Sequence, residues 1–577
     1  MRKLLTFLKG YEKESVLGPL FKLLEATLEL FVPLAVASLI DVGITNKDMK
    51  YCIKMFVFLV VLGVVGLAFS LTAQFFAAKA AVGFVKKIKH ALFQHMESLS
   101  YTEIDRLGTS SMVNRMTSDM NQLQSGMNMA LRLLLRSPFV VAGAFLMAWI
   151  IDRQAAKVFG VTILVLTIIV YGIMLITIPL YRKVQQKLDK VMAATRENLI
   201  GVRVIRAFGL EEEEKDEFIQ KHRELTKGQK FVGSISAMMN PMTYIVINMG
   251  IAVLIWKGAI QVEYGILTQG TVVALYNYMA QILEELVKLA NTIVLLTKMV
   301  ASGNRVQSVL EMESSQRYPE TTDVSHKKDI PHVVFEKVSL KYANAGEESL
   351  KDISFEAKKG QVIGVIGGTG SGKTSLVNLI PRFYDATEGS VFVNGINVTH
   401  YKKEDLRSKI GIVPQKAVLF KGTIRENLCW GNADAREKDL IEALEISQAK
   451  EIVEAKSEKL DFVIAQNGRN LSGGQRQRLT IARALVKKPE ILILDDSASA
   501  LDYATDAKLR KALQNMDEKP TIFIVSQRTA SIQHSDLILV MDDGEMVGMG
   551  THDELLNSCE IYQEIYASQF KKEVANS

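Results

Sequence analysis

The sequence has few cysteines, and their positions exclude the usual cysteine-based frameworks. Only Cys52, Cys429 and Cys559 occur in 577 residues, far apart and without the paired spacing of a zinc site. We therefore expect neither a disulfide framework nor a zinc site, which fits a reducing interior. A cleavable signal pattern is also missing. The basic stretch Met1–Glu14 is followed by an apolar run too long for a signal core, which predicts a retained membrane anchor.

Long apolar runs are missing from the second half of the chain. They fill the first three hundred residues, although the hydrophobic fraction of the whole chain is only 48%. A chain of 577 residues is too long for one ordinary domain, so this pattern predicts a membrane half joined to a soluble half. The net charge of +6 comes partly from basic segments beside the apolar runs. Those segments predict lipid headgroups, rather than nucleic acid, as their neighbours.

The apolar runs predict six membrane crossings, since a helix needs about 20 mostly apolar residues to cross a bilayer. Basic residues flank the first, second and fourth crossings on one side, which predicts that both termini are cytoplasmic. The protein is therefore expected to be a multi-pass protein of the cell membrane. The crossings lie near residues 16–40, 52–82, 128–151, 155–181, 235–258 and 268–300. The flanking residues are Arg2, Lys3, Lys9, Lys13, Lys86, Lys87, Lys89, Arg182, Lys183, Lys187 and Lys190.

The composition predicts three consecutive regions. These are a membrane domain at residues 1–313, an exposed linker at 314–331 and a soluble α/β domain at 332–577. The connections 83–127 and 182–234 are too long for ordinary loops and are expected to be helical continuations of the spans. Within them, we expect Thr102–Ser111 and Phe208–Phe218 to form short transverse helices that touch a soluble domain.

Charged residues inside membrane spans are costly and are therefore candidates for function. In the first span, Lys22, Glu25 and Glu29 share one helix face. We expect Lys22 and Glu25 to pair, whereas Glu29 either belongs to a structural ion pair or faces a cavity and contacts substrate. In the third span, Arg132 and Arg136 are expected to extend toward lipid headgroups.

The first chemical motif is Gly367–Thr374, which fits the phosphate-binding pattern G-x-x-x-x-G-K-[ST]. It follows the apolar strand candidate Val362–Ile366 and precedes the helix-like run Thr374–Leu379, as a phosphate loop requires. Glycines admit backbone N–H groups close to phosphate, Lys373 bridges the terminal phosphates and the Thr374 hydroxyl holds Mg²⁺. The expected phosphate-binding residues are Gly367, Thr369, Gly370, Ser371, Gly372, Lys373, Thr374 and Ser375.

The second motif is the apolar run Ile491–Leu494 followed by Asp495 and Asp496. An acid at the carboxyl end of a buried strand reaches the Mg²⁺ beside the phosphates, a role that we assign to Asp495. The next residue would hold the attacking water. Asp496 is one methylene shorter than a glutamate, and an error of about 1 Å can cost on the order of 10²-fold in rate. The alternative is that both acids only cap the following helix.

The third motif, Leu471–Gln475, opens a helix candidate at Arg476–Leu485. Backbone donors, a hydroxyl and the helix dipole then all point at an anion. Because the phosphate loop already encloses one side of the nucleotide, we expect this segment to complete a site on another copy or a partner. Its residues are Leu471, Ser472, Gly473, Gly474 and Gln475.

Together, the six spans and the ordered motifs resemble a half-transporter of the ATP-binding cassette (ABC) exporters, over nearly the whole chain. The resemblance implies a membrane all-α domain of six helices with long cytoplasmic extensions, followed by an α/β ATP-binding cassette. It implies ATP and Mg²⁺ as cofactors, adenine stacking on Tyr342, and a Gln415 that senses the γ-phosphate and Mg²⁺. By the same resemblance, Ala500-Leu501-Asp502 contacts the facing cassette.

Two positions depart from the family pattern. Asp496 occupies the position of the catalytic glutamate, and Gln527 that of the switch histidine, whose charge change near neutral pH glutamine lacks. The chain thus resembles the degenerate-site subunit of bacterial heterodimeric multidrug exporters. We expect it to pair with a second half-transporter and export small amphipathic molecules, and we expect no nucleic-acid partner. A lipid or peptide exporter and an ATP-gated channel or regulator are the alternatives.

Overall fold

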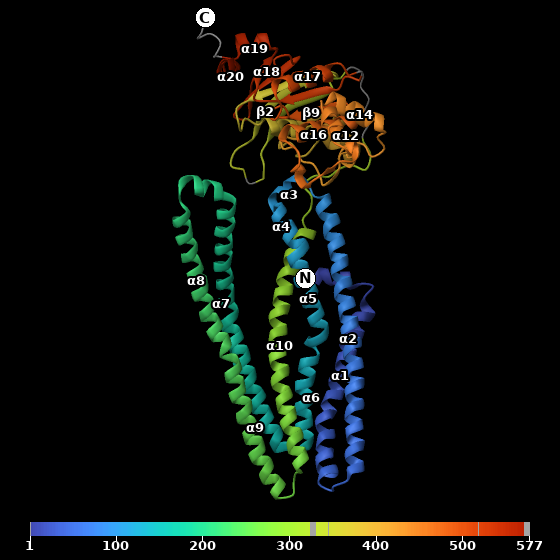
Figure 1. Cartoon of the computed structure of the whole chain (residues 1–577), viewed down its shortest axis with the longest axis vertical. Helices are drawn as coiled ribbons and strands as arrows, with labels where there is room; N and C mark the ends of the chain where they lie inside the picture. The colour runs from blue at the N-terminus through green and yellow to red at the C-terminus, as the bar shows by residue number, and fades with distance from the viewer. Residues whose placement is uncertain (1, 323–329, 344, 517, 571–577) are drawn as a thin grey trace. The chain divides into compact units, whose positions relative to one another are not determined.

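The computed structural model describes residues 2–322, 330–343, 345–516 and 518–570 (Figure 1). The chain divides into two compact units. The first comprises residues 1–97 and 110–312, and the second comprises residues 98–109 and 313–577. Part of the linker expected at 314–331 lies outside the described residues. The domain limits drawn from the sequence stay a prediction.

The first unit is helical and confirms the six expected crossings. Among the described residues, six helical segments are long and apolar enough to span a membrane. The π-helical stretch η2 forms the end of the first of them, and the π-helical stretches η3 and η4 lie within the third. The elements are η1 (Arg2–Leu8), α1 (Glu12–Ser38), η2 (Leu39–Ile44), α2 (Met49–Ser98), α4 (Thr109–Asn114), η3 (Arg115–Asp119), α5 (Met120–Met129), η4 (Ala130–Leu134), α6 (Arg136–Ile151), α7 (Arg153–Phe208), α8 (Glu211–Ala237), α9 (Met239–Glu263) and α10 (Gln269–Leu310).

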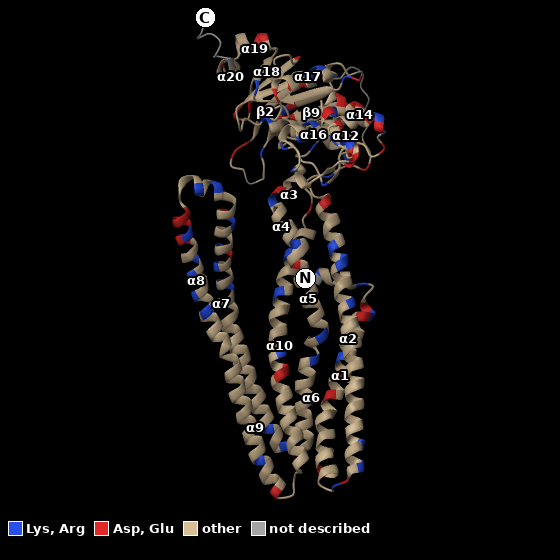
Figure 2. Cartoon of the chain, viewed as in Figure 1, with Lys and Arg blue, Asp and Glu red and all other residues tan. Residues whose placement is uncertain are grey.

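The long helices carry their charges unevenly. Helix α2 has 50 residues, which at 1.5 Å per residue is about 75 Å, well beyond the roughly 30 Å of a hydrocarbon core. Figure 2 shows that charged residues of this unit gather toward the end where α7 turns into α8, whereas the opposite half is largely uncharged. The helices therefore combine an apolar membrane-crossing part with a charged extension.

A buried ion network joins α1, α6 and α10. The Arg136 guanidinium donates to Glu285 at 2.5 Å and to Glu29 at 2.5 Å. The Ser137 hydroxyl and the Lys288 ammonium also donate to Glu285, at 2.7 and 3.1 Å. Only 7% of Arg136 is exposed, so the expectation that it extends to headgroups is wrong, because two carboxylates from neighbouring helices neutralise it in place.

The charges of the first span also find partners. Lys22 and Glu25 form the expected ion pair, at 2.6 Å. Glu29, the residue with two open interpretations, belongs to the Arg136 network while 41% of its side chain stays exposed.

The second unit is built on two sheets. A six-stranded sheet has the order β12-β11-β3-β10-β9-β6, and a four-stranded antiparallel sheet has the order β2-β1-β4-β5. The strands are β1 (Val333–Leu340), β2 (Leu350–Ala357), β3 (Val362–Gly367), β4 (Glu388–Val393), β5 (Ile396–Asn397), β6 (Ile410–Val413), β7 (Gly422–Thr423), β8 (Val463–Ile464), β9 (Ile491–Asp495), β10 (Thr521–Val525), β11 (Leu537–Asp542) and β12 (Glu545–Gly550).

Five neighbouring strands of the larger sheet, β11, β3, β10, β9 and β6, run parallel. Strands β9 and β10 are buried along their whole length, which explains their continuous apolar sequences. Because parallel strands end at the same edge, the residues that follow β3, β9 and β10 meet there.

The helices are α3 (Tyr101–Leu107), α11 (Lys373–Leu379), α12 (Lys403–Lys409), α13 (Ile424–Cys429), α14 (Glu437–Ile446), α15 (Lys450–Glu454), α16 (Gly473–Val486), α17 (Tyr503–Gln514), α18 (Thr529–Ile532), α19 (His552–Ser558) and α20 (Glu560–Phe570), with short 3₁₀ turns η5 (Val398–His400), η6 (Lys459–Asp461) and η7 (Gln466–Gly468).

Of the two expected transverse helices, one forms and the other does not. Within Thr102–Ser111 the short helix α3 forms, begun by a Ser100–Glu103 capping box and ended at Gly108. Phe208–Phe218 instead contains the end of α7, a turn at Gly209 and the start of α8, so no separate short helix forms. Gly209 has a φ of 66°, the left-handed conformation that ends a helix.

Candidate nucleotide-binding site

The phosphate loop lies between β3 and α11, as its sequence predicts. Gly372 precedes the first residue of α11 with a φ of 93°. A Cβ atom at this position would lie 2.5 Å from the Ser349 carbonyl oxygen, so no larger residue fits without movement. The loop therefore turns tightly into the helix and leaves the first N–H groups of α11 without helical partners, as an anion site requires.

Lys373 is folded back over this loop. Its Nζ atom donates to the carbonyl oxygens of Gly367 and Gly368, at 2.9 and 2.5 Å. Burial lowers the pKa of Lys373, while Asp496 and Asp495 act in the opposite direction. A buried ammonium held by carbonyl oxygens can exchange them for the more negative oxygens of a phosphate, which favour its charged form.

Thr374 and Asp495 meet at the carboxyl end of β9. The Thr374 hydroxyl lies 3.0 and 3.1 Å from the two Asp495 carboxylate oxygens. Burial raises the pKa of Asp495, and a cation beside it would oppose that shift. A hydroxyl and a carboxylate are the hard oxygen ligands that Mg²⁺ takes together with nucleotide phosphates. The described part of the chain holds no cluster of three His, Cys, Asp or Glu residues, so this donor set fits Mg²⁺ bound with phosphate rather than alone.

Asp496 and Gln527 lie in the same pocket as the phosphate loop, which has a volume of about 260 Å³. Asp496 has a φ of 46°, and its backbone N–H donates to the Val525 carbonyl at 2.9 Å. Its carboxylate accepts a long hydrogen bond of 3.5 Å from the Gln415 amide. Gln527 is exposed at the rim. The two residues that depart from the family pattern therefore share one site.

The structure brings most of the predicted site residues to this pocket. It also adds Ser349 and Val525, which no motif identified, and Ser526, which directly precedes Gln527 in the sequence. Gly367, Ser371, Tyr342 and Leu471–Gln475 do not line it. The predicted residues that do line it are Thr369, Gly370, Gly372, Lys373, Thr374, Ser375, Gln415, Asp495, Asp496 and Gln527.

Tyr342 lies beside the phosphate-loop helix. Its hydroxyl donates to Ser375 at 2.9 Å, and its ring meets the Tyr384 ring edge-on, with centroids 4.9 Å apart. Tyr384 in turn donates to Asp105 of α3 at 2.6 Å. Burial raises the pKa of Tyr384, which keeps this hydroxyl protonated as a donor. The sequence carried no signal for Tyr384, because neither its spacing nor its neighbours match a motif.

The Leu471–Gln475 segment forms the N-terminus of α16. Ser472 and Gln475 make a capping box, in which Ser472 N–H donates to the Gln475 side chain at 3.0 Å and Gln475 N–H donates to the Ser472 hydroxyl at 3.3 Å. Ser472 and Gly473 are exposed. This N-terminus is therefore open to a molecule outside the pocket of its own chain.

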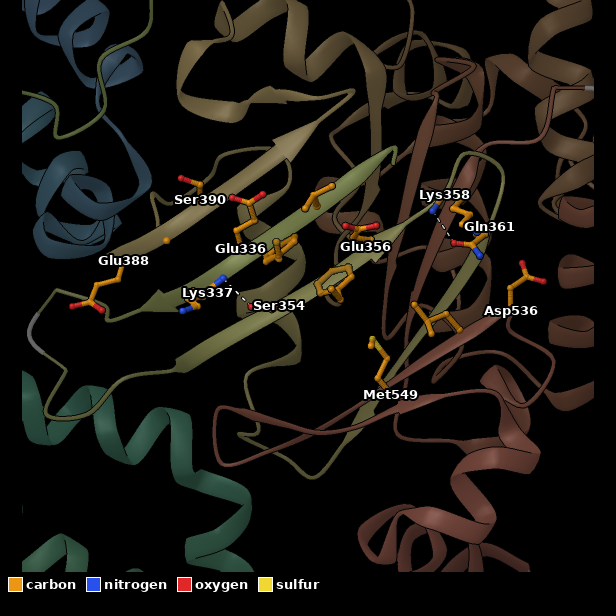
Figure 3. A pocket seen from close by; sticks show the side chains of 15 residues that line it. Glu336, Lys337, Ser354, Glu356, Lys358, Gln361, Glu388, Ser390, Asp536 and Met549 are labelled. Carbon is orange, nitrogen blue, oxygen red and sulfur yellow. Dashed lines mark hydrogen bonds between the residues drawn. The ribbon is translucent and has the colours of Figure 1, made fainter. Parts of the chain in front are cut away.

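A larger hollow, of about 1120 Å³, lies on the four-stranded sheet and is lined by more acidic than basic side chains (Figure 3). The two hydrogen bonds drawn there join Lys337 N–H to Ser354 and Lys358 N–H to Gln361, and both are internal to the strands and their turn. Its labelled acidic side chains would repel a phosphate group. They are Glu336, Glu356, Glu388 and Asp536.

Replacing Lys373 by alanine is expected to weaken ATP binding by this chain about 10- to 100-fold, because hydrogen bonds to charged groups contribute roughly 1.5–3 kcal/mol. Photo-crosslinking of radiolabelled 8-azido-ATP, with the chain resolved on a gel, measures binding at its own site. Lys359→Ala, which removes an exposed lysine outside the pocket, is the control. Equal labelling of both variants would contradict the assignment.

Comparison with known proteins extends these observations to the whole chain. The family model for the ABC transporter transmembrane region matches residues 15–286, and the ABC transporter model matches residues 350–499. The chain is 34% identical to YfiB of Bacillus subtilis, an uncharacterized ABC transporter ATP-binding protein, over 100% of both chains. It is 29% identical to an ATP-dependent lipid A-core flippase of Syntrophus aciditrophicus, over 85% of this chain and 81% of the flippase. A solved bacterial Atm1-family ABC exporter with ATP bound has the same fold, with a TM-score of 0.80 and 21% identity over 97% of this chain and 98% of that one.

Proposed function

Because the chain belongs to the ABC transporter family, as an exporter half-transporter, we propose that it forms one half of a heterodimer that exports amphipathic molecules across the cytoplasmic membrane. Its own site binds ATP and hydrolyses it slowly. Its Leu471–Gln475 segment completes a competent site on the partner subunit. Both termini and the cassette face the cytoplasm, as the basic flanks of the spans favour.

The observation that carries this proposal is the pairing of two substitutions in one pocket. Asp496 follows the Mg²⁺-binding Asp495, where a glutamate would reach the attacking water, and its side chain is one methylene too short. Gln527 lines the same pocket and takes up no proton near neutral pH. The residues that bind phosphate and Mg²⁺ are all present, so binding is retained while hydrolysis is impaired.

The mechanism follows from these roles. Two ATP molecules join the two cassettes, each held between the phosphate loop of one chain and the exposed α16 N-terminus of the other. Thr374 and Asp495 would hold a bound Mg²⁺, whose charge would neutralise part of the phosphate charge. Closure of the cassettes shifts the membrane helices to the outward-open state, and hydrolysis at the partner's site resets the cycle.

Restoring the family residues with Asp496→Glu and Gln527→His is expected to raise hydrolysis at this chain's site about 10-fold or more, since placement errors of about 1 Å cost up to 10²-fold. Photolabelled nucleotide recovered from this chain should change from mainly ATP to mainly ADP. The control is the same double variant with Lys373→Ala, which should recover neither nucleotide.

Two results would contradict the proposal. The first is an unchanged ATP to ADP ratio in the restored variant. The second is brisk ATP hydrolysis by the purified wild-type chain alone, because a homodimer would then be sufficient.

A lipid cargo is the second candidate, and the similarity to the lipid A-core flippase favours it. Lipids and drug-like molecules are both amphipathic, so the residues of the ATP site do not distinguish them. Movement of fluorescent lipid in proteoliposomes that contain the complex, compared with efflux of a fluorescent dye, separates the two cargo classes.

A further inference from the structure

A cavity of about 580 Å³ lies in the first unit, among helices α7, α8, α9 and α10. This is within the usual range of pockets that bind drug-sized ligands. One part of its wall is apolar and another is polar. The apolar residues are Ile173, Met174, Ile178, Met239, Ala290 and Val294.

The polar part of the wall carries two positive charges and no negative charge. Arg182 of α7 and Lys298 of α10 both line the cavity, and no acidic residue does. Within the described chain, neither cation forms an ion pair. By contrast, the carboxylates of Glu29 and Glu285 in the same unit are paired with Arg136. The cationic charge in this cavity is therefore uncompensated, whereas the buried carboxylates of the unit are neutralised.

Several of the other polar groups of the wall have hydrogen-bond partners within the chain. The Tyr181 hydroxyl lies 3.2 Å from the Ser236 hydroxyl, and the Thr177 hydroxyl donates to the Met174 carbonyl at 3.3 Å. The Gln185 amide donates to Asp189, an acidic residue one turn further along α7, at 3.1 Å. The cavity therefore combines an apolar wall with two cations that form no ion pair within the described chain.

We propose that this cavity binds an amphipathic organic anion, with its acidic group between Arg182 and Lys298 and its apolar body against Ile173, Ile178 and Val294. Describing this ligand as cargo rests on the proposed export function, whereas the binding itself does not. The same chemistry is present in a soluble organic acid and in an anionic lipid, whose headgroup and acyl chains provide the same two parts.

Direct binding to the purified full chain in nanodiscs tests this proposal. Fluorescein, which is anionic, and rhodamine 123, which is cationic, share the same ring system, so they separate charge from shape. In zwitterionic phosphatidylcholine discs, fluorescence anisotropy should show fluorescein binding at least about 10-fold tighter than rhodamine 123. Arg182→Gln combined with Lys298→Gln should weaken fluorescein binding about 10-fold or more and leave rhodamine 123 binding no weaker.

Lys183→Gln combined with Lys190→Gln is the matched control, because it removes two exposed α7 cations that do not line the cavity. If Arg182 and Lys298 only contact bulk headgroups, both double variants will lose the same affinity, and the proposal is then wrong. It is also wrong if the two dyes bind the wild-type chain equally. Circular dichroism and 8-azido-ATP labelling of each variant identify loss of folding.

Discs that contain phosphatidylglycerol distinguish the two sources of the anion. If the lipid competes with fluorescein, and the Arg182→Gln and Lys298→Gln double variant loses this competition, the result supports an anionic lipid as occupant. Fluorescein binding that is unaffected by the lipid supports a soluble organic acid. Dye binding requires neither the partner nor turnover. The binding test can therefore succeed even if the heterodimer proposal is wrong, and it can fail even if that proposal is right.

Discussion

Replacing Ser472 by arginine is expected to lower the ATPase rate of the assembled transporter about 10²- to 10³-fold, although Ser472 does not line this chain's own nucleotide pocket. Ser472 and Gly473, at the start of α16, are exposed and do not line the nucleotide pocket of their own chain. In the proposed heterodimer they complete the partner's competent site. An arginine there removes the hydroxyl donor and places a bulky side chain where the γ-phosphate would lie.

The matched control is Thr551→Arg. Thr551 also begins a helix with a capping box, on α19, and is exposed. Both substitutions remove a helix cap, which costs about 1 kcal/mol of stability, but only Ser472 belongs to the expected composite site. The ATPase rate of the complex with its co-purified partner should therefore fall for Ser472→Arg and change little for Thr551→Arg.

Asp496→Asn in the same complex completes the test. If hydrolysis occurs mainly at the partner's site, this change should alter the total rate by no more than about twofold. A large loss with Asp496→Asn, together with a small one for Ser472→Arg, would reverse the proposed division of roles between the two sites.

Replacing Arg136 by leucine is expected to destabilise the membrane unit by about 3–5 kcal/mol, because it leaves the buried Glu285 carboxylate without its guanidinium partner. Only 3% of the Glu285 side chain is exposed. Lys288 and Ser137 still donate to Glu285, but Glu29 also loses its ion-pair partner. Thermal unfolding of the purified chain in detergent should show a lower midpoint.

Arg132→Leu is the control for this prediction. Arg132 lies on the same membrane segment, is half-buried and, within the described part of the chain, makes a single long hydrogen bond, of 3.4 Å to Gln74. The double variant Arg136→Leu with Glu285→Leu should unfold at a higher temperature than Arg136→Leu alone, since it also removes the buried carboxylate that has lost its guanidinium partner. Equal unfolding midpoints for Arg136→Leu and Arg132→Leu would mean that the network contributes no stability.

The local chemistry of the site could be predicted because each motif is contiguous. The strand Val362–Gly367, the glycine loop and the helix Lys373–Leu379 follow one another, and the φ of 93° at position 372 favours glycine. The six crossings were equally predictable, since their length and hydrophobicity are set by the bilayer. The sequence pattern did not predict β2 (Leu350–Ala357), which pairs with β1 in the four-stranded sheet.

The sequence by itself determined which chemistry the chain carries: a phosphate loop, an acid after a buried strand, two departures from the family pattern and six apolar spans. Only the tertiary structure decided which distant charges meet. It paired Arg136 with Glu29 and Glu285 and, among the described residues, left Arg182 and Lys298 without an acidic partner. The physical reason is that backbone conformation and hydrophobic periodicity act over a few neighbouring residues, whereas an ion pair depends on the packing of helices far apart in sequence.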